Sequence, residues 1–318
     1  MKTAAVLQQD AVFAGGLSKT YKSFRGRPVK ALENVTLRIP RGSSFGLLGP
    51  NGAGKTTFSK ILLGCVRPTA GIATIFGEPA GSQASRAKIG YVAEVSSAPE
   101  HLTARQFVEF QAALYRLDAM EGARRAGELL DTVGLGSRCD EEMRRYSKGM
   151  RQRAAIAAAL VHRPRMLILD EPTEGLDPEG RRHVIDLIRS LNRDLGITLL
   201  IHSHLLHEVE SLCTSVALLN RGKLIREGDL RTLTARQGYT VTLGNVPPSL
   251  AAALQLRFDL EQMNASGNLR FDVPSRDDLD WALNEVRNAG ARLENLAARG
   301  TLEELFLEET RGELAWQH

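Results

Sequence analysis

The sequence predicts an α/β protein built on a largely parallel sheet, followed by a small α+β domain. Three observations favour this fold class. A glycine-rich loop, residues 49–57, lies between an apolar run at 44–48 and a helix-compatible segment at 56–63. A second apolar run, 166–169, ends in two adjacent carboxylates. From about residue 237 onward, short strands and helices alternate in the order β-α-β-β-α-β, which is typical of a ferredoxin-like domain.

The composition is that of an ordinary soluble protein, with 43% hydrophobic and 25% charged residues. A chain of 318 residues is expected to form about two domains. The net charge of +4 comes without basic runs interleaved with aromatic residues, so we expect no nucleic-acid partner. No apolar stretch approaches the roughly 20 residues that span a bilayer. Three widely spaced cysteines without metal-ligand spacing indicate free thiols in a reducing compartment.

The N-terminal segment predicts a hairpin. Residues 1–12 read as a flexible lead-in, and apolar residues then alternate over 14–21 and 31–39 around a basic turn at 22–30. We expect an antiparallel hairpin laid beside the strand at 44–48. Tyr21 precedes the turn, where it could stack on a purine or serve as an ordinary half-buried strand residue.

The loop at 49–57 reads GPNGAGKTT and matches the pattern G-x-x-x-x-G-K-[ST] between a strand and a helix. Its glycines allow a tight turn in which successive N–H groups point into one concavity that suits a phosphate. Lys55 can reach the terminal phosphates, and the Thr56 hydroxyl can ligate Mg²⁺. The alternative is a glycine-rich turn without a ligand. We predict that the loop binds a nucleoside triphosphate through Gly49, Pro50, Asn51, Gly52, Ala53, Gly54, Lys55, Thr56 and Thr57.

Helical periodicity replaces strand character in the middle of the chain. Strand-like runs occupy 72–76 and 89–92, and helices are predicted at 104–116, with Thr103 as N-cap, and at 121–133. We interpret residues from about 95 to 164 as a helical insertion. Ser147 begins a further alanine-rich helix there. Its hydroxyl could simply cap that helix, or the open helix start could bind a second phosphate.

The run Met166-Leu167-Ile168-Leu169 predicts a buried strand, and parallel sheets bind ligands at the carboxyl ends of their strands. Asp170 is therefore placed to hold Mg²⁺ and Glu171 to accept a proton from water, although two acids could also be a solvated strand end. A turn at 176–178, a helix at 179–191 and a strand at 197–201 follow.

The strand at 197–201 ends in His202-Ser203-His204. Either histidine could contact a γ-phosphate, and their spacing does not choose between them, because residues two apart in an extended chain point the same way. A hairpin at 215–219 and 223–227 closes the sheet.

Residues 237–318 predict the accessory domain. We expect strands at 239–243, 256–260, 268–273 and 292–297, and helices at 248–256, 276–289 and 301–309. Acids at the start of the second helix are explained by capping and by the helix dipole, so no catalytic cluster is expected in this domain.

Taken in this order, the motifs make residues 14–230 similar to the ATP-binding subunit of ABC transporters, which have a P-loop NTPase core with an antiparallel β subdomain and a helical insertion. The resemblance implies that Tyr21 stacks on adenine and that Asp170 and Glu171 are the metal ligand and the catalytic base. It assigns Ser147 and Gly149 to the signature that contacts ATP, and Asp177 to the D-loop. The histidine of the family lies between a small residue and an apolar pair, which selects His204 over His202 as the second catalytic residue.

Two departures from the family pattern point to one branch. Glu94 occupies the position of the usual glutamine that senses Mg²⁺ and the γ-phosphate, and the signature reads Ser147-Lys148-Gly149-Met150. Both features resemble the drug, antibiotic and lipid exporters of the ABC-2 type. A carboxylate at position 94 can still ligate Mg²⁺, although it adds negative charge beside the phosphates.

The resemblance implies an enzyme that hydrolyses ATP with Mg²⁺ and powers export through a separate membrane permease. Its site would form between two copies in a head-to-tail dimer, on the cytoplasmic face of the cell membrane. A soluble ATPase of the same family, acting in assembly or as a scaffold without a permease, is the alternative. We expect the catalytic domain at residues 13–236 and the accessory domain, with a role in dimerisation or regulation, at 237–318.

Overall fold

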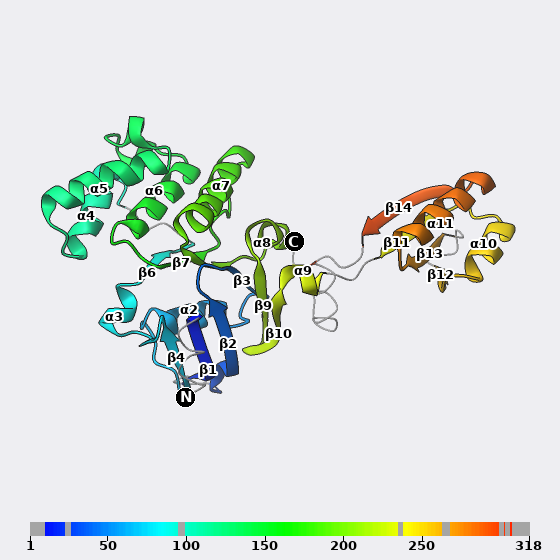
Figure 1. The fold of residues 1–318 in the computed structure, drawn as a ribbon, viewed down its shortest axis with the longest axis horizontal. Helices are drawn as coiled ribbons and strands as arrows, with labels where there is room; N and C mark the ends of the chain where they lie inside the picture. The colour runs from blue at the N-terminus through cyan, green and yellow to red at the C-terminus, as the bar shows by residue number, and fades with distance from the viewer. Residues whose placement is uncertain are drawn as a thin grey trace. The chain divides into compact units, whose positions relative to one another are not determined.

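The computed structural model describes residues 10–22, 27–94, 99–234, 238–262, 268–298, 302 and 306. The chain divides into two compact units, Met1–Asp229 and Leu230–His318, and Figure 1 shows the elements of each. This division, between residues 229 and 230, lies slightly before the boundary expected at residues 236–237. Residues 1–9 of the expected N-terminal lead-in lie outside the described residues, and the prediction is wrong for residues 10–12, which belong to the first strand, Asp10–Tyr21.

A six-stranded sheet forms the centre of the first unit, with the strand order β10-β9-β3-β8-β7-β6. All neighbouring pairs are parallel except β9 and β10. Every residue of β3, β7 and β8 is buried, which explains why these strands are almost continuously apolar. The strands are β3 (Ser44–Leu48), β6 (Ile89–Val92), β7 (Met166–Asp170), β8 (Thr198–His202), β9 (Ser215–Asn220) and β10 (Lys223–Asp229).

A second, antiparallel sheet has the order β2-β1-β4-β5. It consists of β1 (Asp10–Tyr21), β2 (Val29–Pro40), β4 (Ala70–Ile75) and β5 (Glu78–Pro79). The predicted hairpin is present, but its expected position beside β3 is wrong, since β3 pairs with β8 and β9. Strand β2 alternates between buried and exposed residues and therefore suits a sheet with one covered face. Both sheets pack around α2 (Lys55–Leu62) in one hydrophobic core.

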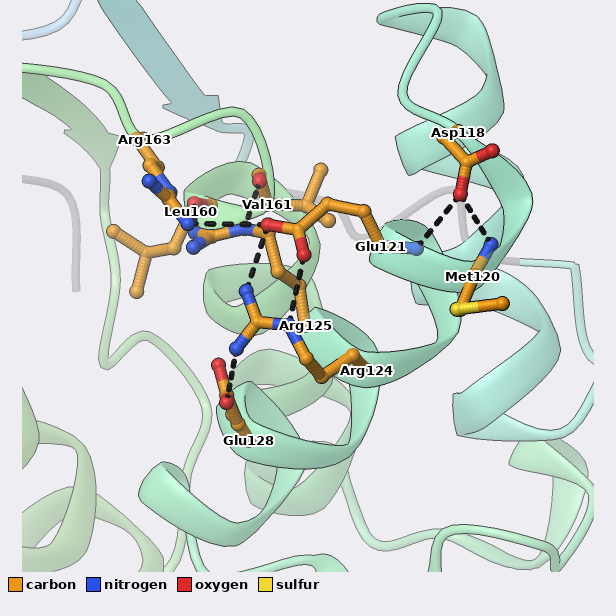
Figure 2. Close-up of polar contacts among 9 residues, drawn as sticks. All are labelled: Asp118, Met120, Glu121, Arg124, Arg125, Glu128, Leu160, Val161 and Arg163. Atoms are coloured by element: carbon orange, nitrogen blue, oxygen red, sulfur yellow. Dashed lines mark hydrogen bonds and ion pairs between the residues drawn. The ribbon is translucent and has the colours of Figure 1, made fainter.

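The helical insertion contains α4 (Ala104–Leu114), α5 (Ala119–Thr132) and α6 (Lys148–Leu160), with two short 3-10 helices between the last two. Thr103 caps α4 as predicted, and Gln106 completes a capping box. Figure 2 shows how α5 holds the end of α6: Arg125 donates hydrogen bonds to the Leu160 and Val161 carbonyls.

The first unit also contains the helices α3 (Gln83–Arg86), α7 (Pro178–Leu195) and α8 (Leu206–Leu212). Helix α9 (Leu230–Leu233) directly follows it and belongs to the second unit. The sequence did not predict α8, which is short and begins at Leu205 without a side-chain cap. In the described part of the chain, none of the helices combines the length and the apolar character that a membrane span requires.

After α9, the second unit contains an antiparallel sheet of order β12-β13-β11-β14 and the helices α10 and α11, and from β11 to β14 its elements follow the predicted β-α-β-β-α-β order. It has its own core, which includes Phe258 and Phe271. The expected strand at 256–260 is wrong: Leu256 ends α10 and Phe258 packs on Phe271, so that the strand starts only at Leu260. The elements are β11 (Tyr239–Gly244), α10 (Pro248–Gln255), β12 (Leu260–Gln262), β13 (Leu269–Val273), α11 (Arg276–Ala289) and β14 (Arg292–Ala298).

The last predicted helix, 301–309, lies outside the described residues except for Leu302 and Phe306, which are both helical and buried.

Candidate functional site

The glycine-rich loop joins β3 to α2 and is packed too closely for side chains at two of its glycines. A Cβ on Gly49 would lie 2.3 Å from the Leu219 carbonyl oxygen, and one on Gly54 would lie 2.5 Å from that of Ala31. Gly54 has φ of 112° and caps α2 without a side chain. The first N–H groups of α2 therefore face the loop with the positive end of the helix dipole. This is the local geometry of an anion site.

Lys55 lies within this loop and is only 8% exposed. Its Nζ donates hydrogen bonds to the carbonyl oxygens of Gly49, at 2.5 Å, and Pro50, at 3.3 Å. Burial lowers the pKa of Lys55, while the charges of Glu171 and Asp170 oppose that shift. The loop therefore presents its one buried ammonium group on the same side as the two acids.

Asp170 is the last residue of β7 and is held by His202, the last residue of β8. The two are paired across the sheet, and His202 Nδ1 lies 3.1 Å from Asp170 Oδ1. The other ring nitrogen of His202 lies 3.0 Å from Ser59 Oγ on α2. Burial alone would raise the pKa of Asp170, but His202, Lys55 and Tyr91 bring it below its ordinary value. Asp170 is therefore held as a carboxylate.

Tyr91, on the neighbouring strand β6, shares this environment. Burial and the Asp170 carboxylate raise the pKa of Tyr91 to about 12, so its hydroxyl keeps its proton. The sequence did not single out Tyr91, Ser59 or the role of His202. The pairing of β6, β7 and β8 brings Tyr91 and His202 beside Asp170, and α2 contributes Ser59.

Glu171 follows Asp170 and is held by His204. His204 Nδ1 lies 2.9 Å from Glu171 Oε2, and the His204 backbone N–H also donates to that oxygen. Burial raises the pKa of Glu171, although His204 and Lys55 oppose the shift. The backbone of Glu171 has φ of 46°, a strained conformation for a residue with a side chain. A carboxyl group of raised pKa on a strained turn is typical of functional sites.

A second group of predicted residues gathers where α6 and α7 begin. Ser147 caps α6 by accepting from the Met150 N–H, and Asp177 caps α7 by accepting from that of Gly180. A Cβ on Gly149 would lie 3.3 Å from Gly180 Cα, so the two helix starts are close together. Capping thus explains both side chains locally, and the positive ends of the two helix dipoles lie close together.

The remaining predicted residues are exposed. Tyr21 ends β1 with 38% of its surface accessible, and Lys19 Nζ lies 5.1 Å from its ring centroid. Thr56 and Glu94 are also exposed. With Asp170, these two residues offer only oxygen ligands, the donor type that Mg²⁺ prefers, so the residues present fit a magnesium ion.

The residues Glu171, Glu174 and His204 form a further cluster whose potential ligand atoms lie within 4.8 Å of one another. Two of these residues already bond each other, and nothing in the described residues sets the cluster apart from an ordinary acidic loop. We therefore assign it no metal.

The chain is similar to several known proteins. Residues 32–174 match the family model described as ABC transporter. An uncharacterised ABC transporter ATP-binding protein of Synechocystis is 35% identical over 311 residues, covering 96% of this chain and 86% of the relative. The daunorubicin resistance ATP-binding protein DrrA3 of Streptomyces coeruleorubidus is 36% identical, covering 87% of this chain and 90% of that protein.

Among solved structures, the ATP-binding cassette MJ0796, as a dimer in a post-hydrolysis state bound to ADP and Pi, matches with a TM-score of 0.62 and 30% identity. The match covers 69% of this chain and 99% of the cassette.

Proposed function

Because the chain belongs to the ABC transporter family of ATP-binding proteins, whose members hydrolyse ATP, we propose that it powers export of a substrate through a separate membrane permease. The observation that carries this proposal is the joint position of Lys55, Asp170 and Glu171 at the carboxyl edge of the central sheet. The name of DrrA3 as a resistance protein supports export of a drug-like or antibiotic molecule.

We assign ATP binding to the loop. The N–H groups at the start of α2 would bind the phosphates, and Lys55 would exchange its bonds to Gly49 and Pro50 for bonds to phosphate oxygens. The exposed ring of Tyr21 would stack on the adenine. Thr56, Asp170 and Glu94 would hold Mg²⁺, which when bound neutralises charge on the phosphates.

Glu171 is the proposed base. Its carboxylate would take a proton from the attacking water, and a pKa above the ordinary value makes it a better proton acceptor near neutral pH. His204 already donates to Glu171 and is thus placed to orient that carboxylate. His202 supports Asp170 instead and has no direct part in the chemistry.

We infer a head-to-tail dimer in which Ser147 and Gly149 of one copy complete the phosphate site of the other, with Asp177 beside them. The packing of the two helix starts supports this, since it presents them as one surface. ATP would stabilise the closed dimer because it binds both halves at once.

The permease is proposed to dock on the helical insertion. Phe110 and Leu114 lie four residues apart on α4, and 51% and 61% of their respective surfaces are exposed. Residues at this spacing share one helix face, so the pair offers an apolar contact for a partner. Such a partner would hold the chain at the inner face of the membrane.

Glu171→Gln tests the proposed base, because it keeps the side-chain volume and removes the proton acceptor. We expect ATP binding to persist, kcat to fall at least a hundredfold and an ATP-dependent dimer to accumulate. Lys55→Ala is the matched variant for binding and should lose ATP affinity in calorimetry. Parental hydrolysis by Glu171→Gln would refute the assignment of the base, and unchanged affinity of Lys55→Ala would refute that of the loop.

A further inference from the structure

Glu208, on α8, is a buried carboxylate that the mechanism above does not use. It is 2% exposed. Its Oε2 accepts a hydrogen bond from the hydroxyl of Thr173, which is itself 1% exposed. Its Oε1 lies 3.4 Å from Nε of Arg181, a side chain that remains 37% exposed. A carboxylate buried this deeply is tolerated only with such partners, so the position of each partner is restricted by the others.

The three residues come from three segments of the proposed site. Thr173 lies two residues after Glu171 in the loop that follows β7. Arg181 is in the first turn of α7, which Asp177 caps. Glu208 is four residues after His204, in the first turn of α8. One carboxylate therefore connects the segments that carry the proposed base, the D-loop aspartate and the histidine that contacts the base.

Of the two contacts of Glu208, only the one with Thr173 is a directional hydrogen bond. Arg181 Nε and Glu208 Oε1 are close enough for an ion pair, but neither atom has a hydrogen-bond partner in good geometry. Arg181 thus supplies charge and Thr173 fixes orientation. A second connection joins α7 to the end of α8, because Arg189 donates to the Ser211 carbonyl oxygen at 3.3 and 3.2 Å.

We propose that Thr173 and Glu208 are positioning residues for ATP hydrolysis. Their hydrogen bond keeps the loop after β7 and the start of α8 in one register, and this register sets the 2.9 Å contact between His204 and Glu171. Neither residue acts on ATP directly. The inference rests on the proposed role of Glu171 as the base.

Four variants of the full chain test it by steady-state MgATP hydrolysis. Thr173→Val removes the donor at nearly constant volume, and Thr173→Ser retains it. The double variant Thr173→Val/Glu208→Leu removes the bond without leaving a buried carboxylate unpaired, which protects the fold. His207→Gln, at an exposed position on the same helix, is the matched control.

We expect kcat of Thr173→Val and of the double variant to fall at least tenfold, with KM for ATP within about threefold of the parent. Thr173→Ser should restore most of kcat, and His207→Gln should match the parent. A double variant that melts at the parental temperature and hydrolyses ATP at the parental rate overturns the inference, as does Thr173→Ser as slow as Thr173→Val. Loss of hydrolysis in the parent chain itself would instead refute the proposed function.

Discussion

His202 and His204 hold different acids, although they are separated by a single residue. His202 is fully buried between Asp170 and Ser59, and His204 is exposed and contacts Glu171. Strand β8 ends at His202, so the alternation of an extended chain no longer applies at His204. One histidine therefore supports the proposed metal ligand, and the other contacts the proposed base.

The raised pKa of Glu171 predicts a pH-dependent cost in stability. The folded chain binds the Glu171 proton more tightly than the unfolded chain, so the favourable contribution is complete below the ordinary pKa of 4.5 and is lost as the pH rises through the folded value. Glu171→Gln is neutral at every pH. Near pH 8, we expect this variant to melt a few degrees above the parent, by about 2–4 °C for each 1 kcal/mol by which the buried charge destabilises the parent. Near pH 4, the variant and the parent should melt at the same temperature.

Thermal melts without nucleotide across this pH range measure the effect. Glu179→Gln, at an exposed position on α7, serves as the control and should follow the parent curve. A Glu171→Gln variant that melts below the parent at pH 8 contradicts the raised pKa.

The sequence predicts the site where its residues are contiguous. The loop at 49–57 and the pair Asp170 and Glu171 each form a local pattern beside a strand, and both lie where expected. The supporting contacts could not be predicted. Ser59 and His202 are 143 positions apart, and Thr173 and Glu208 are 35 apart. Only the strand order and the packing of α8 bring such pairs together.

At the scale of elements, α5 and α6 cap each other with arginines. Arg125 of α5 donates to the carbonyl of Leu160, the last residue of α6, at 3.1 Å and to that of the C-cap Val161 at 2.6 Å. Arg153 of α6 donates to the Val133 carbonyl at 2.9 Å, just after α5 ends. A cation at each helix C-terminus satisfies free carbonyls and complements the dipole. The helix that begins with Ser147 is therefore fixed at its far end by α5.

Arg125 and Arg124 are neighbours on α5, but we expect their substitution to affect stability to different extents (Figure 2). Arg124 pairs with Glu121 and Glu128 on the surface, where water and salt screen the charges and such pairs add little to stability. Arg125 is half-buried on main-chain carbonyls, and its loss should cost about 1–2 kcal/mol. We expect Arg125→Gln to lower Tm by about 2–8 °C and Arg124→Gln to change it little.

Thermal melts of both variants against the parent decide this. Arg125→Lys is a useful intermediate, because it keeps the charge but lacks the planar fork that reaches two carbonyls. An equal loss in Tm for Arg124→Gln and Arg125→Gln would show that the capping bonds carry no special weight.

Elements with local signals were predictable from the sequence, and elements that depend on packing were not. Thr103 and Ser147 mark their helices by capping, and both are N-caps in the structure. Helix α8 has no side-chain cap and is not predicted; the four-residue helix α3 is capped by Ser82 but is too short to show helical periodicity, so it is not predicted either. The region around Phe258 looked like a strand because its apolar residues serve the core of the second unit. The hairpin of β1 and β2 pairs with β4, and β3 pairs with β8 and β9; no local signal in the sequence specifies these pairings.

At the scale of the whole molecule, each unit has its own hydrophobic core. The core of the first unit joins both sheets to α2, and the core of the second joins its sheet to α10 and α11. All proposed site residues lie in the first unit. The solved cassette matches 69% of this chain, whereas DrrA3 matches 87%, more than the first unit alone contains. At least part of the second unit therefore aligns with that relative.

This division predicts that residues 1–229 fold without the remainder. Hydrophobic burial within the core of one unit does not depend on the other unit. Removal of residues 230–318 should therefore leave the calorimetric unfolding transition of the first unit in place. ATP affinity by calorimetry should stay within about threefold of the full chain.

In the Glu171→Gln background, we expect the truncated chain to form less ATP-dependent dimer, because we propose that the second unit supports pairing. Unchanged dimerisation would remove that role, and a truncated chain that aggregates or fails to bind ATP would show that the first unit depends on the second.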